Sequence, residues 1–145
     1  MADSDSDTSA RVLVVEDDQS ITRMLRFSLR SAGFGITEVA TGAEALRRLE
    51  DEPPDAVVLD LSLPDGQGEA VLNRLRQNSS RSPVWLAMSA IDHQEAIERF
   101  GPLDGHFLAK PFDPWNLVEM LQEMLASQEP TDPSPTDPLK EERVS

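Results

Sequence analysis

Short apolar runs alternate along most of the chain with longer segments in which apolar residues recur every three or four positions. The runs predict strands at 12–15, 36–39, 56–59, 84–88 and 107–109. The segments between them predict helices at 20–32, after Thr41, around 70–75, at about 92–100 and after Asp113. Strands joined through helices run parallel, so the pattern indicates a doubly wound α/β sheet of five strands.

Several residues mark the helix ends in this pattern. Gly33 is expected to end the first helix, and Thr41 with Glu44 forms a capping box that opens the second. Asp113 followed by Pro114 is typical of an N-cap and first helical position. The unbroken apolar run 56–59 predicts a strand buried on both faces, and 36–39 predicts an edge strand.

Polar side chains of distinct chemistry stand where four of the predicted strands end. They are Glu16, Asp17 and Asp18 after the first strand, Asp60 after the third, Ser89 after the fourth and Lys110 after the fifth. The carboxyl ends of parallel strands share one rim, and ligands of such sheets bind there. Gathered carboxylates repel one another unless a cation offsets their charge, and Mg²⁺ suits such oxygen ligands.

These residues suit phosphoryl transfer to a carboxylate. Asp60 beside a metal could attack phosphorus and become an aspartyl phosphate, while Lys110 supplies positive charge and Ser89 a hydroxyl donor. Each residue alone also has an ordinary interpretation. The acidic triplet or Ser89 could cap a helix, Asp60 could begin a turn, and Lys110 could be a solvated strand end.

Composition narrows the function classes. The chain of 145 residues holds 27 acidic and 13 basic residues, a formal net charge of −14, which argues against direct nucleic-acid binding. It has no cysteine, which excludes disulfides and thiolate chemistry, and no apolar run long enough for membrane insertion. We therefore expect a cytoplasmic protein. Lys110 is the only lysine of the predicted body, since the other, Lys140, lies in the tail.

The chain divides into three parts. Residues 1–10 read as a disordered acidic leader, 11–126 as the folded domain, and 127–145 as a disordered tail rich in Pro and acidic residues. No output domain is predicted after the body, so the expected protein is a single stand-alone domain.

Four blocks of sequence carry a family resemblance: RVLVVEDD, PDAVVLDLSLPDGQG, VWLAMSA and FLAKPF. With TGAEAL and PFDPWNLVEML, they resemble the receiver domains of bacterial response regulators over about residues 10–126. The resemblance implies a flavodoxin-like fold with strand order 2-1-3-4-5. It also implies a stand-alone signalling module of a two-component system or phosphorelay, without enzymatic activity beyond its own phosphorylation and dephosphorylation.

The resemblance also implies roles for single residues. Asp60 is the expected phosphoacceptor, and the Mg²⁺ ligands are Asp17, Asp60, the Ser62 carbonyl and, through water, Glu16. Ser89 and Lys110 would contact the phosphoryl oxygens, with a cis bond between Lys110 and Pro111. Ser89 and Phe107 would form the switch.

The implied partners are a sensor histidine kinase or phosphotransfer protein as donor, and a downstream protein target. The target would bind the surface of residues 92–100, 107–109 and the last helix. Two features depart from the family pattern: Ser62 stands where Met is common, and GPLDGHF replaces the usual turn before the last strand. His93 and His106 show no metal or relay pattern, so we expect both at the surface.

Two other classes share parts of this pattern. A pseudo-receiver, a binding module that needs no phosphorylation, is expected to lack one of the key residues, yet all are present. A haloacid-dehalogenase-type phosphatase would carry a second Asp two residues after the nucleophile, where this chain has Ser62. No P-loop motif occurs.

Overall fold

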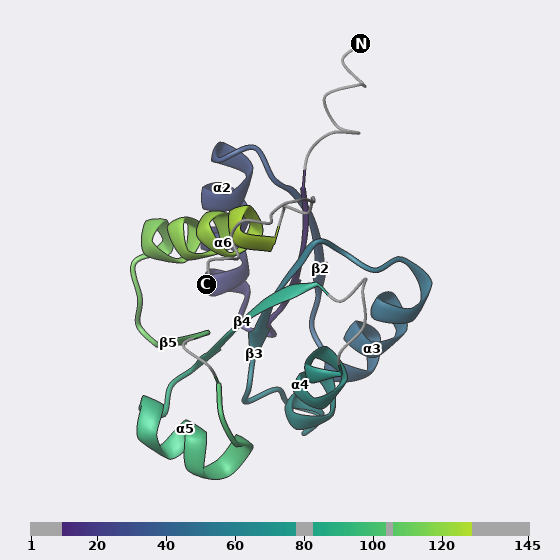
Figure 1. Ribbon diagram of the computed structural model, residues 1–145, viewed down its shortest axis with the longest axis vertical. Coiled ribbons are helices and arrows are strands. Elements are labelled where there is room, and N and C mark those ends of the chain that lie inside the picture. The colour runs from purple at the N-terminus through teal and green to yellow at the C-terminus, as the bar shows by residue number, and fades with distance from the viewer. Residues whose placement is uncertain (1–9, 78–82, 104–105, 129–145) are drawn as a thin grey trace, which may run out of the picture.

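The computed structural model describes residues 10–77, 83–103 and 106–128. Its five strands form one parallel sheet in the order β2-β1-β3-β4-β5 (Figure 1). The strands are β1 (Arg11–Val15), β2 (Gly35–Val39), β3 (Ala56–Asp60), β4 (Val84–Ser89) and β5 (Phe107–Ala109). This order confirms the predicted flavodoxin-like, doubly wound fold, with β2 at an edge as expected.

The five helices of the described residues cover both faces of this sheet (Figure 1). They are α2 (Gln19–Ser31), α3 (Gly42–Asp51), α4 (Gly68–Arg76), α5 (His93–Phe100) and α6 (Pro114–Gln128). Helices α2 and α6 pack on one face, and α3, α4 and α5 pack on the other. Helix α6 continues two residues beyond the predicted end of the folded domain at 126. The rest of the predicted leader and tail lies outside the described residues.

Side chains of the central strands alternate between two hydrophobic cores. In β1, Leu13 and Val15 enter the core under α3 and α4, whereas Val12 and Val14 enter the core under α2 and α6. Every residue of β3 is buried. This confirms the prediction that the run 56–59 is covered on both faces, which leaves only the strand ends free for chemistry.

The helix ends largely follow the predicted signals. Gly33 has a φ of 96°, just after α2, and the Asp113 carboxylate accepts a hydrogen bond from the Trp115 N–H at 2.9 Å. Thr41 Oγ1 accepts one from the Glu44 N–H at 3.2 Å. The Glu44 carboxylate bonds the N–H of Ala40 at 3.4 Å, one residue earlier than a standard capping box.

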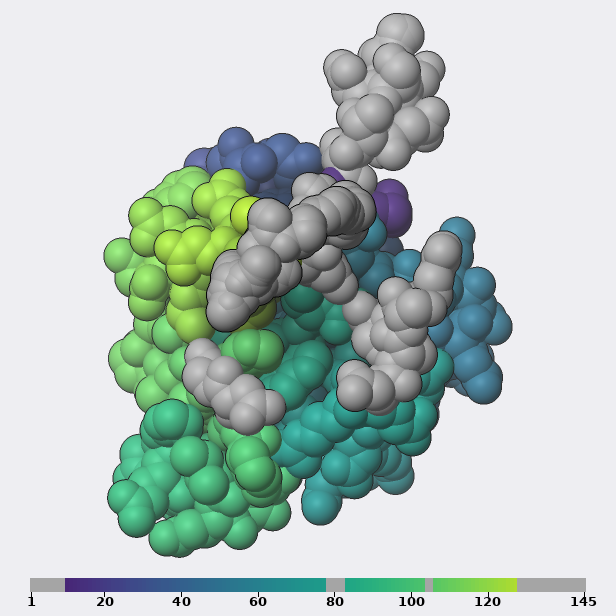
Figure 2. Space-filling view, viewed as in Figure 1, coloured from purple at the N-terminus to yellow at the C-terminus, as the bar shows by residue number. Residues whose placement is uncertain are grey.

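Helix α5 stands out at one corner of the molecule (Figure 2). It is held there from α4, because the Arg76 guanidinium donates to the carbonyls of Phe100 at 2.8 Å and Pro102 at 2.6 Å. The helix predicted at 92–100 is therefore present and anchored at its carboxyl end. In the part of the chain described, no helix is both long and apolar enough to cross a membrane.

Candidate functional site

The sheet register brings the predicted residues to one rim. Asp60 at the end of β3 pairs with Met88, and Ser89 at the end of β4 pairs with Ala109. The backbone N–H of Lys110 then donates to the Ser89 carbonyl at 2.8 Å. Residues separated by up to 94 positions along the chain thereby become neighbours.

Lys110 lies between two carboxylates. Its Nζ is 2.8 Å from Glu16 Oε1 and 3.2 Å from Asp60 Oδ2. The side chains of Glu16 and Asp60 are only 1% and 4% exposed, and that of Lys110 is 17% exposed. Nearly buried carboxylates need a partner of opposite charge, and the Lys110 ammonium serves both. The peptide bond between Lys110 and Pro111 is cis, as predicted.

The electrostatics of this trio follow from burial. Burial raises the pKa of Glu16, and the hydrogen bonds from Lys110 and the Asp18 N–H oppose that rise only in part. For Lys110, burial acts to lower the pKa, but the hydrogen bond to Glu16 and the charge of Asp60 outweigh it and raise the pKa. Lys110 therefore stays a cation at neutral pH.

Three carboxylates form a cluster suited to a metal ion. One oxygen each of Glu16, Asp17 and Asp60 lies within 4.8 Å of the others, and Asp17 is exposed. Hard divalent cations prefer carboxylate oxygens, and Mg²⁺ usually keeps several waters, for which the exposed Asp17 leaves room. The donor set therefore fits Mg²⁺.

The other predicted metal ligand, Ser62, lies beside this cluster. Its backbone N–H donates to Asp60 Oδ1 at 2.9 Å. The peptide of Ser62 is therefore next to the phosphoacceptor candidate, while the role of its carbonyl stays a prediction. Asp18 has an ordinary structural role, because its Oδ1 caps α2 by accepting from the N–H groups of Ser20 at 2.8 Å and Ile21 at 3.2 Å.

Ser89 is fully buried at the end of β4. Its Oγ accepts a hydrogen bond from the Ile91 N–H at 3.2 Å. The N-cap of α5 is Asp92, whose Oδ1 accepts from the Glu95 N–H at 2.8 Å. The alternative interpretation of Ser89 as a helix cap is therefore wrong.

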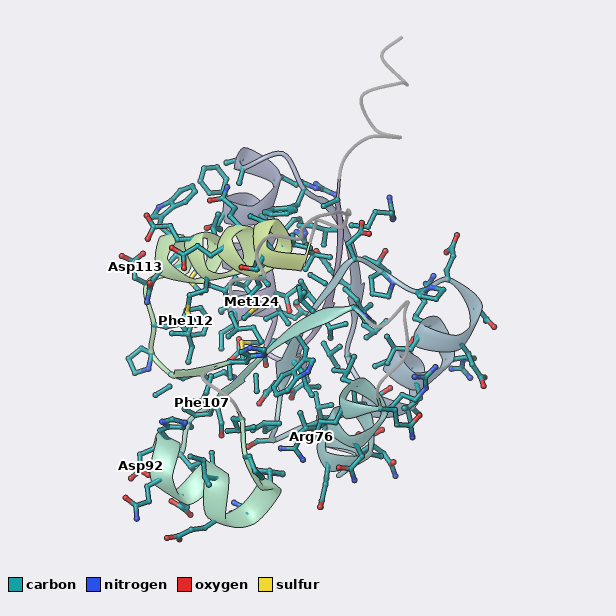
Figure 3. The ribbon with its side chains drawn as sticks, in the orientation of Figure 1. Arg76, Asp92, Phe107, Phe112, Asp113 and Met124 are labelled. Atoms are coloured by element: carbon teal, nitrogen blue, oxygen red, sulfur yellow. The ribbon has the colours of Figure 1, made fainter. Side chains whose placement is uncertain are left out.

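Phe107 lies between the sheet and α5 (Figure 3). It is half-buried, and its ring stacks on the exposed His93, with centroids 5.2 Å apart and an interplanar angle of 12°. His106 is half-buried, so the prediction that it lies at the surface is only partly right. Its Nδ1 is buried without a hydrogen-bond partner among the described residues, and its ring meets Trp85 edge-on at 4.9 Å. The cause is its place just before β5, where its carbonyl bonds the Ala87 N–H of β4.

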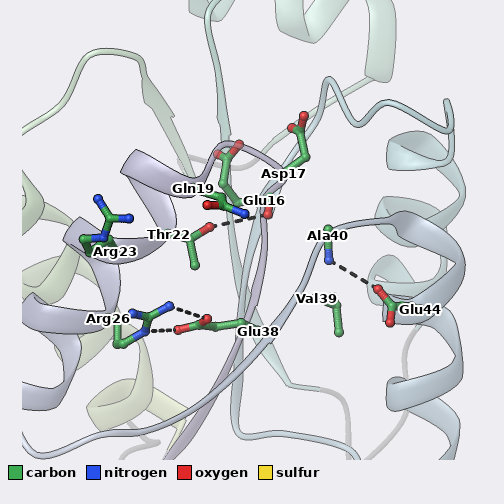
Figure 4. Close-up of a pocket in the computed structure, with 10 residues that line it drawn as sticks. All are labelled: Glu16, Asp17, Gln19, Thr22, Arg23, Arg26, Glu38, Val39, Ala40 and Glu44. Atoms are coloured by element: carbon green, nitrogen blue, oxygen red, sulfur yellow. Dashed lines mark hydrogen bonds and ion pairs between the residues drawn. The ribbon is translucent and has the colours of Figure 1, made fainter.

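A groove of about 440 Å³ leads from the acidic cluster along α2 (Figure 4). Glu16 and Asp17 line one end, and Arg26 and Glu38 lie further along, joined by hydrogen bonds of 2.6 and 2.8 Å. The hydrogen bond from Arg26 lowers the pKa of Glu38. This groove was not predicted from the sequence. Thr22 and Arg26 line the groove from α2 and are one helical turn apart. The polar face of α2 was therefore the sequence signal that could have indicated the groove.

Comparisons with known proteins agree with this arrangement. The response regulator receiver domain model matches residues 12–122. The transcriptional regulatory protein PrrA of Mycobacterium tuberculosis is 38% identical over 120 residues, which are 81% of this chain and 51% of that protein. The chain thus spans about half the length of the curated relatives it matches.

Solved structures show the same likeness. A putative response regulator from Chloroflexus aurantiacus is 34% identical with a TM-score of 0.72, covering 82% of this chain and 99% of that one. The receiver domain of the sensor histidine kinase PA1611 from Pseudomonas aeruginosa is 31% identical with a TM-score of 0.70, covering 82% and 99%. It has a magnesium ion coordinated in its active-site cleft. By sequence, fold and site geometry, this chain belongs to the response regulator receiver domain family.

Proposed function

We propose that this chain is a phosphoacceptor receiver, phosphorylated on Asp60 by a phosphohistidine donor. One observation carries the proposal. The Asp60 carboxylate is nearly buried at a strand end, with Lys110 Nζ at 3.2 Å and oxygens of Glu16 and Asp17 within 4.8 Å. A buried carboxylate surrounded in this way is held in place. The neighbouring ammonium and a metal ion held by the carboxylates would together stabilise an anionic phosphoryl group on it.

The proposed step transfers a phosphoryl group between two side chains. An Asp60 oxygen attacks phosphorus, an O–P bond forms, and the P–N bond of the donor phosphohistidine breaks. The electron pair of that bond returns to the imidazole nitrogen, which takes up a proton from water. The Lys110 ammonium stabilises negative charge on the phosphoryl oxygens, and the Ser89 hydroxyl donates to one of them.

Mg²⁺ is the proposed cofactor. Asp17 and Asp60 would bind it directly, Glu16 through water, and Ser62 through its backbone carbonyl. When bound, the ion neutralises charge on the phosphoryl oxygens during transfer. The oxygen donors of this chain and the magnesium in the receiver of PA1611 support the assignment.

The proposed output is a change of surface. When Ser89 moves toward the phosphoryl group, Phe107 turns inward, and the face made by α5, β5 and α6 changes shape for a downstream protein. That face carries Ile97, whose side chain is well exposed. We propose a sensor histidine kinase or phosphotransfer protein as donor, action in the cytoplasm, and no enzymatic turnover of other molecules.

Intact-mass measurement with acetyl phosphate tests this function. With Mg²⁺ we expect the protein to gain one phosphoryl group, and the Asp60→Asn variant to gain none. Asp51→Asn is a matched control, because Asp51 is an exposed acidic residue at the end of α3. If the wild-type protein neither gains mass nor binds beryllofluoride with Mg²⁺, the phosphoacceptor function is refuted and the pseudo-receiver interpretation takes its place.

A further inference from the structure

The connection between β4 and α5 is attached at both ends to a predicted switch residue. At its start, the Ile91 N–H donates to Ser89 Oγ at 3.2 Å. At its end, the His93 ring stacks on Phe107 with centroids 5.2 Å apart. Three consecutive residues, 91–93, therefore link the two side chains that the proposed function moves.

We infer that His93 is a positioning residue that holds Phe107 in the orientation seen here and so sets how readily the site switches. The inference rests on the proposed function, in which Phe107 turns inward. An inward turn would separate the Phe107 ring from His93, which is exposed on the first turn of α5. The stack therefore opposes switching.

The surroundings of Phe107 make this contact important. Phenylalanine has no hydroxyl, so no hydrogen bond can hold its ring in one orientation. Phe107 also packs against the hydrophobic core, as Ile91 and Phe100 do. Hydrophobic contact is non-directional, whereas a stacked aromatic pair has a preferred geometry. Within the described residues, His93 is the ring that stacks on Phe107.

A movement of Ser89 would be transmitted to His93 through the same connection. When the Ser89 hydroxyl moves toward Asp60, the bonded Ile91 N–H must follow or lose its partner. Asp92 caps α5 through the Glu95 N–H at 2.8 Å, so the first turn that holds His93 is tied to the connection. Phosphorylation would thus disturb the stack by moving His93. At the same time, the movement of Ser89 would leave space into which Phe107 can turn.

Isothermal titration calorimetry with beryllofluoride in the presence of Mg²⁺ tests the inference. Beryllofluoride stands in for the phosphoryl group, and its apparent affinity rises with the fraction of protein able to switch. We expect His93→Ala to bind roughly 2- to 10-fold more tightly than wild type, the worth of one aromatic pair. His93→Phe keeps a stacking ring and is expected to restore wild-type affinity to within about twofold. Gln94→Ala, the exposed neighbour, is the control.

The outcomes separate the inference from the function. If wild type binds beryllofluoride but all three variants match it, His93 has no positioning role, although the site functions. If His93→Phe behaves like His93→Ala, the stack is not the cause and the inference is also overturned. If wild type does not bind at all, the phosphoacceptor function fails and the inference fails with it. Urea unfolding of each variant checks that the affinities compare folded proteins.

Discussion

Replacing Lys110 by Met would leave two nearly buried carboxylates without their cation. The ammonium lies 2.8 Å from Glu16 and 3.2 Å from Asp60, whose side chains are 1% and 4% exposed. Removing one partner of a buried ion pair costs about 3–5 kcal/mol in the free energy of unfolding. Because the Lys110 side chain is 17% exposed, water reaches the site. We therefore expect the lower end, about 3 kcal/mol at neutral pH.

Urea unfolding at about pH 5.5 and about pH 8 measures this cost and its cause. Burial already raises the pKa of Glu16 above 4.5, and loss of Lys110 removes the main opposing interaction. Glu16 of the variant therefore takes up a proton as the pH falls, which removes one uncompensated charge. The deficit of Lys110→Met relative to wild type should thus be smaller at the lower pH.

Two controls identify the charge as the cause. Adding Glu16→Gln to Lys110→Met should recover part of the lost stability, since one carboxylate is gone. Mg²⁺ should stabilise Lys110→Met more than wild type, because a cation that binds the folded state compensates the free carboxylates. A deficit below about 1 kcal/mol, equal at both pH values, would refute the reasoning, since such a value is typical of exposed ion pairs.

Three further predictions concern the same framework. Arg76→Ala should lose about 1–3 kcal/mol of stability and speed amide exchange in α5, measured by hydrogen exchange, because the carbonyls of Phe100 and Pro102 lose their donor. Leu86→Ala, fully buried in β4, should cost about 2–5 kcal/mol in urea unfolding. The raised pKa of Lys110 contributes stability that is complete below the ordinary value of 10.5 and is lost as the pH rises through the raised value. Wild type should therefore lose more stability in that alkaline range than Lys110→Met, and equal losses would contradict the assignment.

The rim of the site could be predicted from sequence because its geometry follows from the strands. Parallel strands place their carboxyl ends at one edge of the sheet, so Glu16, Asp60, Ser89 and Lys110 were expected at that edge if the apolar runs were strands. The strand order came instead from the family resemblance, since periodicity does not say which strands are neighbours.

Features that depend on side-chain direction in connections escaped prediction. The half-buried position of His106 and its edge contact with Trp85 have no periodic signal in the sequence. The hydrogen bonds of Arg76 to the end of α5 cross between two helices that sequence spacing does not relate. Asp65 likewise joins the start of α3 to the β3–α4 connection through the N–H groups of Gly42 and Ala43, at 3.2 and 3.1 Å.

The acidic residues at the strand ends show that the structural and chemical interpretations need not compete. Asp18 caps α2, since its carboxylate oxygen accepts hydrogen bonds from the N–H groups two and three residues later. Asp60 makes a similar bond to the Ser62 N–H through Oδ1, yet its Oδ2 faces Lys110. The turn bond removes rotational freedom from the Asp60 carboxylate, so the oxygen that faces the cation is held before any phosphoryl donor arrives. The turn interpretation of Asp60 is therefore part of how it would act as a phosphoacceptor.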